Sequence, residues 1–272
     1  MRLFVVIVGL LLAGLAAAQS TLTQNLSSTT QPAFSGNFAL GYTSNLYEPG
    51  TASQDRSVSG DLTMNYRVQG ANLVRGYFGG YKQLDDAEEW KSNDGFVGWV
   101  NNGFWHRGEK YTFGQQVRVQ LPFSKESRVR DTKLTGVSLV PVMQAKLAPS
   151  VLFIYQPQLI KNFHTYTVNR AGTSNTSWAI NQLALISWSV TDSIYLQPLL
   201  VYGTAWSYKG TKKDDVFQTG AELGYGINNT FTIAGGWTNA GAIRSFENGN
   251  DQTIRVFDEN TSTVYAALYL VF

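Results

Sequence analysis

The sequence has no cysteine and only two histidines among its 272 residues. The lack of cysteine excludes a disulfide scaffold, thiol catalysis and a metal site with Cys ligands. A serine hydrolase needs a Ser that is activated by a nearby His, and no Ser stands two residues after His106 or His164. We therefore expect both histidines to be solvated loop residues and the protein not to be an enzyme.

The sequence also has little excess of charge of either sign. The chain carries 21 Lys and Arg against 19 Asp and Glu, a formal net charge of +2. This balance gives no electrostatic reason to expect a nucleic-acid partner. No Gly-rich phosphate motif occurs between a strand and a helix, so no cofactor is predicted. The acidic run 85–89 has the chemistry to bridge divalent cations with lipopolysaccharide phosphates, but its pattern favours a plain solvated loop, and no metal site is predicted.

One long apolar run is present, and it lies at the N-terminus. Arg2, the apolar residues Leu3–Leu15 and the small residues Ala16–Ala18 have the layout of a secretory signal peptide. The run is too short to span a bilayer, which takes about 20 residues. We predict a signal peptide over 1–18. Residues 19–33, rich in Ser, Thr and Gln, are predicted to be a flexible leader, either loose in the periplasm or tucked into a lumen.

After this region, apolar and polar residues alternate with the period of β-strands, and no sustained helical pattern occurs. Twelve strands are predicted: 34–43, 57–68, 73–82, 95–105, 111–123, 132–146, 151–162, 178–190, 194–206, 216–227, 230–239 and 262–272. The links after the odd-numbered strands are long and polar, whereas those after the even-numbered strands are short. Asn228-Asn229 and Asp192 in two of the short links favour tight turns. A soluble sandwich has no reason to sort its links in this way, but a transmembrane barrel does.

The last predicted strand, Ser262–Phe272, ends the chain on an aromatic residue. It resembles the final strand of bacterial outer-membrane β-barrels, in which the closing strand ends in Phe and is read by the barrel assembly machinery. The resemblance implies an all-β fold: a closed antiparallel up-and-down transmembrane β-barrel of about 12 strands over 34–272, with both ends in the periplasm. It also implies location in the bacterial outer membrane, lipid and lipopolysaccharide as surroundings, and Phe272 as the assembly signal.

Aromatic residues fit the two membrane interfaces of such a barrel. Trp178 and Trp188 lie on one face of a strand, and their heights differ by roughly 25 Å at the usual rise and tilt, close to the height of the apolar band. Trp206, Tyr42 and Phe163 are predicted at the outer rim, and Trp105, Phe231 and Phe272 at the inner rim.

The opposite faces of the strands predict the lining of the lumen. We expect charged residues of both signs there, together with amides and tyrosines, and these are the candidate solute contacts: Asp61, Asn65, Arg67, Arg75, Tyr77, Tyr81, Gln116, Arg118, Gln120, Lys146, Gln156, Gln158, Gln197 and Glu222. Four basic groups against two acidic groups indicate at most a mild preference for anions. The sequence thus predicts an outer-membrane porin or solute-specific channel that passes small polar or amphipathic molecules by diffusion.

Two features keep an alternative open. The luminal charges have the chemistry to pair across a narrow barrel and close it, leaving the outer loops 163–177 and 240–261 to act in adhesion or surface binding. In addition, parts of the strands between 132 and 206 are apolar on both faces, as in Val140-Pro141-Val142 and Leu183-Ala184-Leu185. That inner wall either packs against an inserted loop or the leader, or lines a path for an amphipathic solute.

Overall fold

The computed structural model describes residues 33–47, 54–85, 89–243, 254, 256–259 and 261–272. The predicted signal peptide, and the leader apart from Ala33, lie outside this part of the chain. The described residues form these elements: β1 (Phe34–Asn45), β2 (Arg56–Gln69), β3 (Asn72–Gln83), β4 (Trp90–Ser92), β5 (Gly95–Arg107), β6 (Tyr111–Leu121), η1 (Glu126–Arg130), β7 (Lys133–Ala148), β8 (Val151–His164), β9 (Thr176–Ser189), β10 (Ile194–Ser207), β11 (Val216–Gly226), β12 (Phe231–Ala242) and β13 (Ser262–Val271). They include no helix that is long and apolar enough to cross a membrane.

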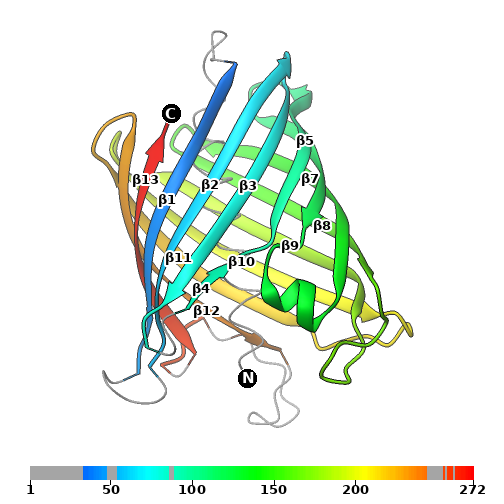
Figure 1. Ribbon diagram of the computed structural model, residues 1–272. Helices are drawn as coiled ribbons and strands as arrows, with labels where there is room; N and C mark the ends of the chain where they lie inside the picture. Colours follow the sequence, from blue (N-terminus) through cyan, green and yellow to red (C-terminus); the bar gives the residue numbers. More distant parts are fainter. Residues whose placement is uncertain (1–32, 48–53, 86–88, 244–253, 255, 260) are drawn as a thin grey trace.

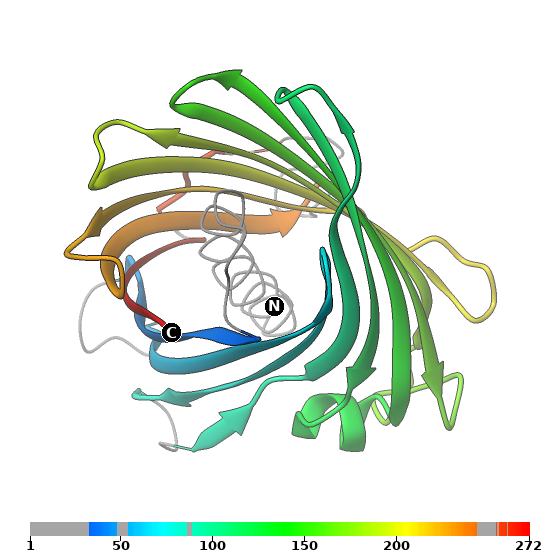
Figure 2. The same cartoon turned by 90° about the horizontal axis from the view of Figure 1, so that it is seen from above.

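The strands close into a barrel (Figure 1). Each long strand pairs antiparallel with the next one along the chain, and β1 pairs with both β2 and β13. The view along the barrel shows the strands arranged in one continuous ring (Figure 2). Among the described residues, only the short strand β4 lies outside the ring, because it pairs with the end of β3 alone. The predicted closed antiparallel barrel of twelve strands is therefore confirmed.

The predicted strand positions agree with the observed ones to within three residues at each end. All short turns lie at one rim and all long links at the other, as the link lengths predicted. Asn228 forms one of the short turns, where its side-chain oxygen accepts hydrogen bonds from the backbone N–H groups of Thr230 at 2.8 Å and Phe231 at 2.9 Å. This is the local bonding for which Asn is favoured in turns.

Two elements in the long links were not predicted. One is β4, a three-residue addition to the edge of β3. The other is the π-helical turn η1. Its sequence has no apolar stripe, and none of its residues is buried. Asp94 fixes the start of this link by accepting a 3.0 Å hydrogen bond from the N–H of Ser124 and a 2.5 Å bond from the hydroxyl of Ser127. Two hydrogen bonds to one carboxylate thus order a segment that has no hydrophobic periodicity.

The seam of the barrel joins the last residue to the first strand. The N–H of Gly36 donates to the carbonyl of Phe272 at 2.8 Å, and the N–H of Phe272 donates to the carbonyl of Gly36 at 3.0 Å. A side chain at position 36 would meet the Phe272 ring at 2.8 Å, so glycine leaves room for the ring. The terminal aromatic residue therefore helps to complete the sheet as well as ending it.

The outward faces of the strands are apolar and exposed. Trp178 and Trp188 are 43% and 44% exposed, and Leu200, midway along β10, is 42% exposed. Large apolar side chains of this kind occur on most of the strands. Soluble proteins rarely expose contiguous apolar surface of this extent, whereas a transmembrane barrel presents it to lipid.

One part of the outer wall differs from the expected lipid face. Near the long-link rim, Thr219, Asn239 and Ser262 point outward by their pairing, yet they are buried. The link before β13 covers them: Thr219 donates to the carbonyl of Val256 at 3.1 Å, and the N–H of Asp258 donates to the hydroxyl of Ser262 at 2.9 Å. This link therefore lies against the outside of the barrel wall at that point.

The orientation of the two faces makes a prediction about stability. Replacing Leu200 by Arg places a charge at the lipid face near mid-depth and should lower the free energy of unfolding by about 2–4 kcal/mol. Replacing Gln158 by Arg is the matched control, since Gln158 lies midway along β8 on the luminal face, and it should cost much less. Urea unfolding of the two variants folded in lipid vesicles measures the difference. Equal losses, or a larger loss for Gln158→Arg, would contradict this assignment of the faces.

Candidate functional site

The luminal face of β10–β13 is organised around one carboxylate, Glu222 on β11. Its Oε1 accepts a hydrogen bond from the hydroxyl of Tyr195 at 2.8 Å, and its Oε2 accepts from Tyr265 at 3.0 Å and Tyr269 at 2.8 Å. Bonds from neutral donors to a carboxylate are charge-assisted and strong. Three tyrosines from two strands on either side of β11 thus satisfy the charge of Glu222 without a cation.

Glycines explain how these tyrosines reach Glu222. Tyr195 stands opposite Gly224 in the ladder between β10 and β11, and Tyr265 stands opposite Gly236 between β12 and β13. A side chain at position 224 would overlap the Tyr195 ring, and one at position 236 would lie 2.7 Å from the Tyr265 hydroxyl. Because both positions lack a side chain, the rings lie along the wall and direct their hydroxyls to the same carboxylate.

The second luminal carboxylate, Asp61 on β2, is satisfied in the same way. The Tyr77 hydroxyl donates a 2.5 Å hydrogen bond to its Oδ1. Gly79, opposite Asp61 in the ladder between β2 and β3, leaves the space in which this contact forms. The Tyr77 ring stacks on Phe96 with 5.5 Å between the ring centroids. Here too, a tyrosine and not a cation is the partner of the acid.

Two arginines lie on the same stretch of wall. Arg75 on β3 and Arg118 on β6 both pair with Gly98 of β5, so the three residues form one row across the wall. The Nε of Arg75 donates to the side-chain oxygen of Asn65 at 2.7 Å. Arg118 donates from Nε at 3.0 Å and from Nη2 at 2.6 Å to the side-chain oxygen of Gln116. Both guanidinium groups are therefore held by neutral amides.

The luminal charges are not paired with one another in the part of the chain that the structure describes. The ion pairs found there lie at the long-link rim: Arg56–Asp85, Arg130–Asp131, Lys133–Asp94 and Lys212–Asp215. Inside the barrel, the acids bond to tyrosines and the arginines bond to amides. The lumen thus keeps its positive and negative groups apart along the wall.

The remaining predicted luminal residues are more dispersed. Gln116, Gln156 and Gln197 are buried, and Gln197 donates to the hydroxyl of Ser187 at 3.0 Å. Gln120 and Tyr81 lie toward the long-link rim, near Lys133 and Lys91 respectively. At the short-turn rim, Arg67 donates to the carbonyl of Gly70 at 2.8 Å, and the side chain of Lys146 is exposed. These last two residues therefore sit at the end of the lumen and away from Arg75 and Arg118. Their role in solute contact stays a prediction.

An apolar cluster covers the luminal face of β7–β10. Its members are buried and alternate along the strands with outward residues: Val140, Val142, Ile154, Leu183, Leu185 and Val201. Leu152 and Leu199 pack against it and are partly buried. This cluster is the apolar inner wall that the sequence indicated, now placed beside the strand that carries Arg118.

Sequence reasoning missed Tyr195, Tyr265 and Tyr269 as site residues. Their period-two positions place them on the luminal face, so that signal was available. Their common partner was not, because it depends on the register between strands, which a single sequence does not give. Gly98 was missed for the same reason, since its role is to separate two arginines on other strands.

The two histidines and Asp85, the first residue of the acidic run, lie near the rims. His106 belongs to the end of β5, where it is exposed and lies 3.2 Å from the Thr112 hydroxyl, and His164 ends β8, 3.2 Å from the Tyr208 hydroxyl. Both were expected in loops, and the strands extend further than the pattern indicated. Of the acidic run, Asp85 accepts hydrogen bonds from the guanidinium of Arg56, which hold the pKa of this carboxyl below its ordinary value. Residues 86–88 lie outside the described part, which contains no cluster of three metal-ligating side chains.

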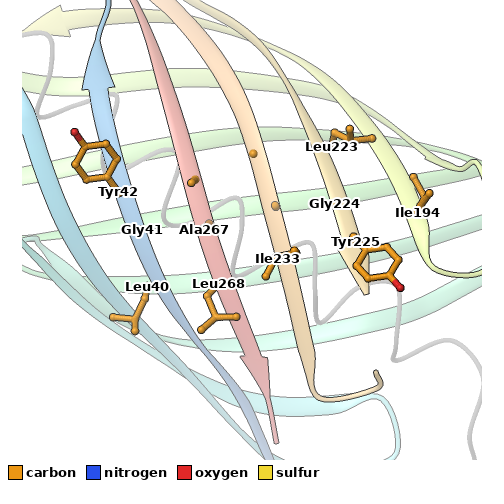
Figure 3. Close-up of a pocket in the computed structure, with 13 residues that line it drawn as sticks. Leu40, Gly41, Tyr42, Ile194, Leu223, Gly224, Tyr225, Ile233, Ala267 and Leu268 are labelled. Atoms are coloured by element: carbon orange, nitrogen blue, oxygen red, sulfur yellow. The ribbon is translucent and has the colours of Figure 1, made fainter. Parts of the chain in front are cut away.

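A shallow depression of about 730 Å³ lies on the opposite, outward face (Figure 3). Leu40, Leu268, Ile233 and Tyr225 surround it, and Gly235 contributes no side chain to its floor. The pairing of β1, β11, β12 and β13 places these residues on the face opposite to Tyr269 and Glu222, away from the lumen. Its apolar lining suits the hydrocarbon of a membrane, so we do not assign it to the solute.

The barrel is similar to solved outer-membrane porins and channels. An outer-membrane channel from Pseudomonas putida F1 has a TM-score of 0.61 and 11% identity over 91% of this chain and 98% of that one. The NanC porin has a TM-score of 0.57 and 10% identity over 87% of this chain and 99% of that one. The KdgM porin, in complex with disordered oligogalacturonate, has a TM-score of 0.54 and 5% identity over 88% of this chain and 99% of that one. At these identities the likeness establishes the fold. No family model and no curated protein matches the sequence.

The Glu222 cluster predicts a loss of stability when one donor is removed. Tyr265→Phe deletes one hydrogen bond to a buried carboxylate and should lower the free energy of unfolding by roughly 1.5–3 kcal/mol. Tyr225→Phe is the control, because Tyr225 points outward from the same strand as Glu222 and is 49% exposed. Urea unfolding in lipid vesicles compares them. If both variants lost the same amount, the cluster would have no special part in stability.

Proposed function

We propose that the protein is an outer-membrane porin or solute-specific channel that passes small polar or amphipathic molecules by diffusion. The observation that carries the proposal is the separation of the luminal charges. Asp61 and Glu222 bond to tyrosines, and Arg75 and Arg118 bond to amides. No ion pair joins these groups in the described structure.

The pairing of the luminal charges distinguishes an open lumen from one that is closed by ion pairs. Two opposite charges inside a closed lumen gain most when they pair, and removing one partner of such a pair is strongly destabilising. A lumen that is held shut by its charges would therefore bring arginines and carboxylates together. Ionisable groups inside a membrane that remain apart are candidates for solute contact. The arrangement observed here therefore supports a passage over a lumen that is held shut by ion pairs.

The fold is consistent with this proposal. Twelve strands lie between eight, at which side chains fill a barrel, and sixteen, at which a wide aqueous channel opens. The neighbours described above carry the names porin and channel. A bacterial outer membrane, with lipid and lipopolysaccharide around the apolar wall, is the corresponding location. We also propose that Phe272 is the residue read by the barrel assembly machinery.

A filled lumen is the second candidate, and the apolar cluster on β7–β10 favours it. Buried apolar side chains such as Val140 and Leu185 are typical of a packed interior. In that case the long links, including 240–261 and 163–177, would act in adhesion or surface binding. The two candidates differ in whether ions cross the barrel.

Conductance in planar lipid bilayers tests the proposal. The folded protein should give discrete current steps, and Gln158→Trp should make them smaller by narrowing the lumen. Leu159→Trp is the matched control, because the neighbouring residue points outward and is 42% exposed, and it should leave the steps unchanged. The change in mobility between unheated and heated samples on a denaturing gel verifies that each variant is folded. A folded barrel without current would overturn the channel proposal in favour of the filled lumen.

A further inference from the structure

The row formed by Arg75, Gly98 and Arg118 has the layout of an anion site. Neighbouring strands are about 4.8 Å apart, so the two arginine backbones, separated by β5, lie about 10 Å apart. Gly98 places no side chain between them, and one there would lie 3.0 Å from the Cγ of Arg118 and 2.7 Å from the carbonyl of Val117. The two long side chains therefore start from one row of the wall, and the position between them carries no side chain.

The hydrogen bonds of these arginines do not use all of their donors, and Arg75 is only 2% exposed. Arg75 uses its Nε for Asn65, and Arg118 uses Nε and Nη2 for Gln116. Within the described structure, Nη1 and Nη2 of Arg75 and Nη1 of Arg118 have no hydrogen-bond acceptor. Phe96 supports the Arg118 guanidinium with its ring, whose centroid is 4.5 Å from Cζ. The amides and the ring thus orient the guanidinium groups without neutralising them.

Electrostatics then favours an oxyanion at this place. Two like charges near each other are unfavourable until an anion joins them. Asp61, on the neighbouring strand β2, already accepts from Tyr77 and forms no ion pair with Arg75 among the described residues. Guanidinium groups bind carboxylates through paired N–H donors in a fixed geometry. A carboxylate carried by a solute has the matching shape and charge.

The apolar cluster begins next to this row. Ser138 of β7 stands opposite Arg118, and Val140 and Val142 are the next two residues along the same face. At the rise of a strand, Val142 is about 13 Å from Ser138. The cluster continues across the wall to Ile154 and Leu185, which are paired between β8 and β9. Since β7 runs from a long link toward a short turn, the cluster lies on the short-turn side of the arginines.

We propose that Arg75 and Arg118 form a carboxylate subsite and that the adjoining cluster receives the apolar part of the same molecule. The solute class is then a small amphipathic carboxylate, such as an aromatic or medium-chain acid. This inference rests on the proposed function, because a channel has to admit the solute to the lumen. It deepens that function by stating which solutes the lumen recognises.

Equilibrium dialysis of the protein in lipid nanodiscs tests the subsite without requiring conductance. The probes are 3-phenylpropionate, its uncharged amide 3-phenylpropionamide, and propionate, which lacks the ring; nanodiscs without protein give the background. We expect 3-phenylpropionate to bind roughly tenfold or more tightly than either of the others. Equal binding of the amide would overturn the carboxylate subsite, and equal binding of propionate would overturn the role of the apolar cluster.

Variants assign the effect to the named residues. Arg75→Gln and Arg118→Gln should each weaken the binding of 3-phenylpropionate by roughly 10–100-fold. Arg107→Gln, at the exposed end of β5 on the short-turn rim, is the control and should leave it unchanged. Val142→Thr keeps the side-chain shape and should weaken 3-phenylpropionate about threefold or more without affecting propionate. Arg118→Lys retains the charge but loses the planar guanidinium, so its affinity should lie between those of the parent protein and Arg118→Gln. It replaces Arg118→Gln in the comparison if that variant does not fold.

The outcome for the subsite is separate from that for the channel. Binding that depends on Arg75 and Arg118 in a barrel without current would support the subsite and overturn the channel. Current steps together with equal binding of all three probes would support the channel and overturn the subsite. If Arg107→Gln weakened binding as much as Arg118→Gln, a general effect of positive charge would replace the specific site.

Discussion

The structure depends on one constraint, which is that backbone polar groups in hydrocarbon have to be hydrogen-bonded within the protein. An open sheet leaves a row of N–H and C=O groups at each edge. Pairing β1 with β13 removes both edges, and the reciprocal bonds between Gly36 and Phe272 continue the pairing to the last residue. Once the sheet is closed, every second side chain faces lipid and the others face the lumen. The faces of all the other residues follow from that closure.

The sequence predicted this part of the structure well because its signals are local. Alternation of apolar and polar residues depends on neighbours along the chain, so the strands from 34–43 to 262–272 could be placed without coordinates. Short turns such as Asn228-Asn229 have their own chemistry. The elements that were missed have no such pattern: β4 exists because the end of β3 offers it a partner, and η1 is held by Asp94 from another segment.

The luminal clusters were predictable as a set of residues but not as contacts. Period two assigns Asp61, Arg118 and Glu222 to the lumen, but it gives no information on which residue of the next strand stands opposite. The register determines that Tyr265 lies across Gly236 and that Gly98 lies between two arginines. A shift of one residue in any of these ladders would place a different pair of side chains in contact. Backbone hydrogen bonding in the hydrocarbon requires a complete ladder, and more than one register provides it. The register therefore has to be read from the structure.

Glycine in the lumen has a consequence for charge as well as for space. Because Gly224, Gly236 and Gly79 leave room for tyrosine rings, the two carboxylates obtain neutral donors and do not need the arginines. The guanidinium groups are then left with amide partners and with each other. A pair of like charges is costly to hold in a folded wall, and an ion pair with Asp61 would have been the simpler way to stabilise it. The arginines are therefore less stabilised within the protein than they would be in ion pairs, and they retain an attraction for an anion from outside it. This balance is expected of a surface that binds and releases a solute.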